Sequence, residues 1–65
     1  MGEKGMEKVG NIIVHLLDGK EFFFCRRTHR VSPEGRVVHI IRKDGDEEEI
    51  VMTVPIRMLH FIDYK

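Results

Sequence analysis

The sequence predicts a small all-β domain from its composition, its spaced turn signals and one proline-marked corner. Valine and isoleucine are abundant while alanine and glutamine are absent, which favours strands over helices. Turn residues at Asp18-Gly19, Ser32-Gly35 and Lys43-Asp46 separate apolar segments. Pro55 cannot donate to a ladder, so it should end a strand and introduce a short 3-10 turn at 56–58. Five strands joined this way fit a small five-stranded antiparallel barrel better than a sandwich, which needs more strands.

The expected barrel domain runs from residue 9 to residue 65. The preceding segment, 1–8, carries glycines and alternating charges without apolar periodicity, so it should form a flexible tail. The first strand should turn Ile12, Val14 and Leu16 toward the core. The five strands are expected near 9–17, 20–31, 36–43, 47–54 and 59–64.

The first two turns set the pairing of three strands. Asp18-Gly19 between two apolar runs predicts a hairpin with a type I′ turn, which needs positive φ at both central residues. A three-residue loop at Ser32-Gly35 would place His29 opposite His39. A slip of one residue would abolish that pairing.

The third turn sets the pairing of the fourth strand. An odd-length loop at Asp44–Asp46 would let Arg42 meet Glu48. The same register would place four apolar side chains on one face: Val38, Ile40, Ile50 and Met52.

The segment 20–31, KEFFFCRRTHRV, changes from an apolar half to a cationic half. It is long for a single strand and has no glycine to bend it, so a bulge or coil is expected within it. Cys25 beside three phenylalanines is interpreted as a small core residue.

Two pieces of the chain resemble the Sm family of small barrels. LLDGKEF looks like the first hairpin of the Sm motif, and VPIRMLHFI is similar to its closing segment. Together they cover 16 of the 65 residues. The resemblance implies an Sm-like or SH3-like barrel fold.

The residues that form the RNA site of Sm proteins are mostly different here. Phe24 stands where the family has a glycine, while Arg30 and Glu34 stand roughly where it places an acidic residue and an asparagine. Arg57 matches the arginine of the closing Arg-Gly pair, but Met58 replaces the glycine. The resemblance therefore carries over only Arg57 as a nucleic-acid-binding residue.

Charge, cysteine content and hydropathy limit the partners and the location expected for the domain. The formal net charge is zero, so binding to nucleic acid must come from a local patch rather than a global field. Cys25 is the only cysteine, which excludes an intrachain disulfide and favours a cytoplasmic location. No apolar run approaches the roughly 20 residues of a membrane-spanning helix, so a soluble protein without membrane contact is expected.

The arginines suggest the function. A guanidinium matches phosphate geometry, and Phe23 or Phe24, if exposed, could stack on bases. We therefore expect a non-enzymatic module that binds RNA or DNA through Arg26, Arg27, Arg30 and Arg36. The alternative is a protein-interaction or assembly module without a nucleic-acid role, in which these arginines pair with Glu21, Glu34 and the acidic run 46–49 on the surface or across an interface.

Other chemistry has little basis in the sequence. His29 and His39 could hold a metal if they face each other, but two imidazoles are half of a structural zinc site. No nucleophile has a recognisable base and orienting group, so no catalytic residue and no cofactor are predicted.

Apolar side chains occupy both faces of several expected strands. A monomeric barrel buries only one face, so the second would remain exposed in water. A homo-oligomer is therefore expected, with a symmetric dimer as the simplest form.

Overall fold

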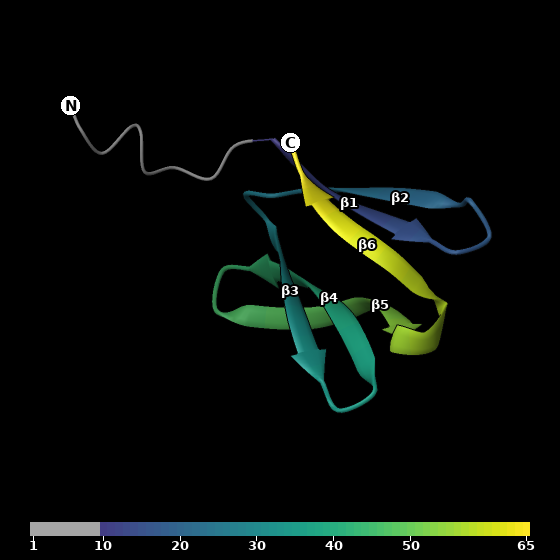
Figure 1. Ribbon diagram of the computed structural model, residues 1–65. Helices are drawn as coiled ribbons and strands as arrows, with labels where there is room; N and C mark the ends of the chain where they lie inside the picture. The colour runs from purple at the N-terminus through teal and green to yellow at the C-terminus, as the bar shows by residue number, and fades with distance from the viewer. Residues whose placement is uncertain (1–9) are drawn as a thin grey trace.

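The computed structural model describes residues 10–65, which form six antiparallel strands in two three-stranded sheets (Figure 1). The strand order is β2-β1-β6 in one sheet and β3-β4-β5 in the other. The tail predicted at 1–8 lies outside the described residues. The elements are β1 (Asn11–Leu16), β2 (Glu21–Cys25), β3 (His29–Glu34), β4 (Val37–Asp44), β5 (Glu47–Pro55), the 3-10 turn η1 (Ile56–Met58) and β6 (Leu59–Tyr64).

The all-β class, the 3-10 turn and the last strand are confirmed, but the prediction of five strands is wrong. The expected long strand 20–31 divides at Arg26–Thr28 into β2 and β3, which belong to different sheets. Hydrogen bonds join strands within each sheet, and none closes a barrel in residues 10–65. In Figure 1 the chain passes between the sheets at the turn before β3 and again at η1.

The core lies between the two sheets. Ile12 and Val14 of β1 meet Ile40 of β4 and Val54 of β5, and each is at most 3% exposed. Burying each side chain is worth about 1.5–3 kcal/mol. The partly buried residues around them include Leu16. The predicted core face of the first strand is therefore confirmed, although β1 itself is shorter than predicted.

The first hairpin is confirmed, but its turn type is not. The N–H of Gly19 donates to the carbonyl of Leu16 at 3.0 Å, and the N–H of Leu16 donates to Lys20 at 2.9 Å. Gly19 has φ +94°, whereas Asp18 has no positive φ. A three-residue loop that ends on a left-handed glycine therefore replaces the expected type I′ turn.

The second hairpin has a shorter turn than expected. Glu34 pairs with Val37, which leaves only Gly35 and Arg36 in the loop. Gly35 has φ +63° at the first central position, as a type II′ turn requires. The turn also begins two residues later than expected, so the register shifts by three positions and His29 lies opposite Arg42 rather than His39.

The third hairpin also has a two-residue turn, with Asp44 opposite Glu47. Arg42 therefore pairs with Glu49, and the predicted meeting with Glu48 is wrong. The register then shifts, because Ile40 pairs with Met52 and Ile41 with Ile50.

The shift leaves Val51 as an extra residue in β5, as in a β-bulge. Met52 packs against the core, while Ile50 is 54% exposed on the other face. The predicted single face for these two residues is therefore wrong.

The corner at Pro55 ends β5 as expected. The N–H of Ile56 donates to the carbonyl of Arg36 at 2.9 Å, which fixes η1 against the second hairpin. The part of the chain that the structure describes has no helix long and apolar enough to cross a membrane.

Candidate functional site

The turn at Arg26–Thr28 is the link between the two sheets, and backbone hydrogen bonds fix it to both. The N–H of Arg26 donates to the carbonyl of Gly10 at 3.0 Å, and Gly10 directly precedes β1 of the β2-β1-β6 sheet. The N–H of Lys43, in β4 of the other sheet, donates to the backbone carbonyl of Thr28 at 2.7 Å. The arginines of this turn therefore project from a position that both sheets define.

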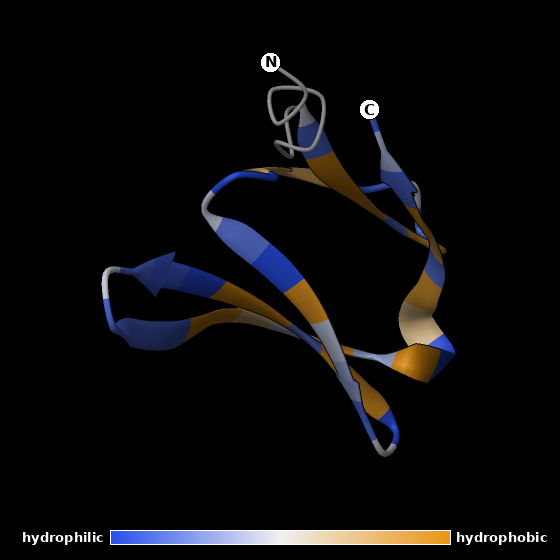
Figure 2. Cartoon of the chain, turned by 90° about the vertical axis from the view of Figure 1, so that its left-hand side faces the viewer, coloured by the Kyte–Doolittle hydropathy of each residue, from blue (hydrophilic) through white to orange (hydrophobic). Residues whose placement is uncertain are grey.

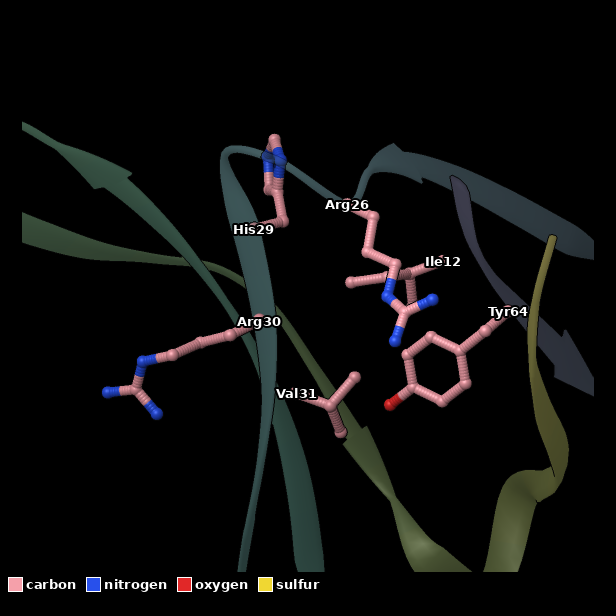
Figure 3. Close-up of a pocket in the computed structure, with 6 residues that line it drawn as sticks. All are labelled: Ile12, Arg26, His29, Arg30, Val31 and Tyr64. Atoms are coloured by element: carbon pink, nitrogen blue, oxygen red, sulfur yellow. The ribbon is translucent and has the colours of Figure 1, made fainter. Parts of the chain in front are cut away.

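Arg26 lies against the last strand. Its guanidinium carbon is 4.7 Å from the centre of the Tyr64 ring, and the side chain is half-buried (Figure 3). Tyr64 pairs with Ile12 in the register of β1 and β6 and keeps 47% of its surface exposed. A cation–π contact at such a site contributes about 0.5–1 kcal/mol. The ring is thus held in place by β6 and the cation by the turn.

A hollow of about 190 Å³ opens beside this contact, between the edges of the two sheets. Ile12 and Val31 supply apolar walls, and Figure 3 shows Val31 and Arg26 directed toward Tyr64 while Arg30 extends away from it. The site thus combines an exposed aromatic ring with cations. Its lining residues are Ile12, Arg26, His29, Arg30, Val31 and Tyr64.

Arg30 is already paired within the protein. Its Nη2 donates to Oε1 of Glu48 at 2.9 Å. This hydrogen bond lowers the pKa of the Glu48 carboxyl. Arg42 pairs in the same way with Glu49 at 3.1 Å. Two of the acidic residues proposed as surface partners thus engage cations of sheet β3-β4-β5, but in exposed positions where such pairs contribute little to stability.

The structure does not gather all the predicted arginines at one place. Arg26 and Arg27 lie in the turn before β3 and Arg30 lies near its start. Arg36 follows the far end of β3, about 16 Å or more away for a strand of this length. Arg36 joins Arg57 around a second, larger hollow of about 580 Å³. The predicted nucleic-acid set is therefore two separate clusters.

The phenylalanines do not supply the predicted stacking surface beside Arg26. Phe24 is half-buried and packs against the core, with its ring 5.3 Å from that of His29. Phe23 is 60% exposed, but alternation along β2 turns it to the opposite face. Tyr64 is the aromatic residue that meets the arginine, and the sequence had not singled it out because the two lie 38 positions apart.

His29 and His39 could hold a metal only if they faced each other, and they do not, because His29 lies opposite Arg42 and His39 opposite Ser32. His29 Nδ1 lies 3.1 Å from the carbonyl of Cys25, while His39 Nε2 lies 3.1 Å from Glu34 Oε1 and Nδ1 lies 2.9 Å from Thr53 Oγ1. Residues 10–65 contain no group of three or more side chains placed to hold a metal ion.

Cys25 is exposed, so its interpretation as a core residue is wrong. Since Phe24 faces the core, its neighbour on the strand must point outward. The backbone N–H of Arg27 lowers the pKa of the Cys25 thiol, and the hydroxyl of Thr28 adds to the effect. Nothing in the surrounding geometry assigns this thiol a reaction.

Comparison with models of protein families, with curated protein sequences and with solved structures found no match to this chain.

Proposed function

We propose that the protein is a non-enzymatic binding module of the SH3-like or Sm-like class that binds single-stranded nucleic acid at Arg26, Arg27 and Tyr64. The observation that carries this proposal is the position of the Arg26 guanidinium over the exposed Tyr64 ring. Two three-stranded sheets and a 3-10 turn before the last strand support the fold class.

The chemistry of the cluster fits a nucleotide. Guanidinium groups match phosphate oxygens, and an aromatic face accepts a base without regard to its identity. Arg27 is exposed and has no ion pair among the described residues, so it is open to a phosphate. An unpaired base can reach Tyr64, whereas a base inside a duplex is already stacked. We therefore expect single strands to bind more tightly than duplexes.

Removing the aromatic ring tests the proposal. Tyr64→Leu should weaken binding of a fluorescent oligo-dT or oligo-U by about fivefold or more, because stacking contributes about 1–3 kcal/mol per base. Phe23→Leu is the matched control, since it removes an exposed ring from the other face and should leave affinity unchanged. The proposal fails if wild-type protein does not bind at tens of micromolar, or if the two substitutions weaken binding equally.

A second candidate function, protein interaction or homo-oligomeric assembly, is favoured by exposed apolar surface. Ile13 and Ile41 alternate with inward-facing residues along β1 and β4, yet both are buried within the monomer. Nine other large apolar side chains are not: Leu17, Phe22, Phe23, Ile50, Val51, Ile56, Met58, Phe61 and Tyr64. Monomers rarely expose large apolar patches, so part of this surface is available to a partner.

A further inference from the structure

The carboxylates at the tip of the β4–β5 hairpin lack intramolecular partners. All other side-chain carboxylates in residues 10–65 lie within 4.0 Å of a basic or histidine side chain, as Glu34 does with His39. The tip carries three that do not: Asp44, Asp46 and Glu47. In Figure 2 this hairpin is the blue, hydrophilic extension on the left of the molecule.

Uncompensated cations lie at the other end of the same sheet. Arg36 and Arg57 are both exposed, and neither has an ion pair among the described residues. They flank the hollow of about 580 Å³, where Ile56 is 47% exposed. The nearest acidic residue along the chain, Glu34, is engaged by His39. This end therefore suits an anionic partner with some apolar surface.

β5 connects these two ends along an open edge. It is the longest strand and the outermost one of its sheet, so one row of its backbone N–H and C=O groups has no strand beside it. Ile50 and Val51, in its middle, are 54% and 42% exposed. The other edge of this sheet, β3, contains Pro33, which cannot donate a hydrogen bond to a further strand.

We propose that two copies of the chain pair along β5, antiparallel and related by a two-fold axis near Val51. Because the strands run in opposite directions, the acidic tip of each copy reaches the Arg36–Arg57 end of the other. Ile50 and Val51 of both copies are covered at the centre. Such an interface uses the same surface on both copies, so the assembly is complete with two subunits.

This inference is independent of the proposed nucleic-acid function. Arg26, Arg27 and Tyr64 belong to the inter-sheet turn and to β6, and the pairing uses neither element. Each copy therefore keeps its own candidate binding site.

A charge exchange tests the pairing by sedimentation equilibrium. Glu47→Arg and Arg57→Glu should each raise the dimer Kd by about tenfold or more, because each places like charges opposite each other. The double variant Glu47→Arg/Arg57→Glu restores opposite charges and should recover most of the affinity. Arg27→Glu, a charge reversal outside the interface, should leave the dimer unchanged.

A second variant tests the edge itself. Val51→Lys places charges at the two-fold axis and should give a monomer, whereas Leu17→Lys, at a 63% exposed position in the first turn, should not. Circular dichroism of each variant checks that it folds. A wild-type chain that is monomeric up to millimolar concentration would overturn the inference. A dimer that survives both Val51→Lys and the charge reversals would do so as well.

Discussion

Arg30 donates a hydrogen bond to the Glu48 carboxylate at 2.9 Å, and the two residues lie on strands that flank the central strand β4. The contact joins β3, an edge strand, to β5, the other edge strand of the sheet. Arg30 is also one of the arginines that the sequence assigns to nucleic acid. Because the contact involves a titratable carboxylate, it should make the stability of the fold depend on pH.

Glu48→Gln should reduce the fall in stability at acid pH. The pKa of Glu48 is lowered in the folded state, so the ionised carboxylate favours folding. That contribution is present above the ordinary glutamate pKa, about 4.3, and is lost as the pH falls through the lower folded-state value. Asp46→Asn, on the same hairpin without an ion pair, is the control. Thermal melts at several pH values measure both, and an identical acid dependence in the two variants would contradict the prediction.

Ile40→Ala should destabilise the fold strongly. Its side chain is fully buried between the sheets, so truncation leaves a cavity and should cost about 2–5 kcal/mol. Ile50→Ala removes the same atoms from a position that is 54% exposed and should cost the monomer less than about 1 kcal/mol. Urea denaturation at low protein concentration compares the two, and equal losses would show that the assigned core is wrong.

Gly10 and Gly19 offer a matched test of backbone strain and steric overlap. Their φ angles are +96° and +94°, so alanine should pay a similar left-handed penalty of about 1–2 kcal/mol at either position. A Cβ at Gly19 meets nothing, whereas one at Gly10 would overlap the backbone carbonyl of Lys65. Gly10→Ala should therefore cost at least about 1 kcal/mol more. Equal melting temperatures for the two variants would exclude the close approach at Lys65.

Cys25 should react with iodoacetamide at a lower pH than an ordinary exposed thiol. The backbone N–H of Arg27 and the hydroxyl of Thr28 favour its thiolate, which is the reactive form. Thr28→Val should move the pH profile of alkylation upward, and Thr53→Val, a hydroxyl on another strand, should not. Mass spectrometry after timed alkylation measures the profile, and a profile that Thr28→Val leaves in place would contradict the assignment.

The sequence predicted the positions of the turns better than the pairing between strands. Asp18-Gly19, Gly35, Gly45 and Pro55 all mark real turns or corners, because backbone freedom at glycine and proline is a local property. Register depends on both the length and the position of each turn. The second turn is one residue shorter and begins two residues later than expected, which moved the partner of His29 from His39 to Arg42.

The sequence also could not predict which side chains of β2 and β5 face the core. Phe22, Phe23 and Phe24 are equally apolar, so their pattern did not show which faced the core. The extra residue at Val51 reversed the face of Ile50, and no local signal marks such a bulge. The contacts of the candidate site were likewise not marked by any local signal. The sequence named Arg26 as a candidate, but its contact with Tyr64 depends on the tertiary fold.

The salt dependence of single-strand binding tests the central claim most directly. Fluorescence anisotropy of labelled oligo-dT from about 25 to 200 mM salt should give a slope of log K against log salt near −1.4, about −0.7 for each of two phosphates held by Arg26 and Arg27. Arg26→Gln/Arg27→Gln should reduce the slope to near zero, while Arg36→Gln/Arg57→Gln should preserve it. A slope that the first pair leaves intact, or that the second pair abolishes, would contradict the account.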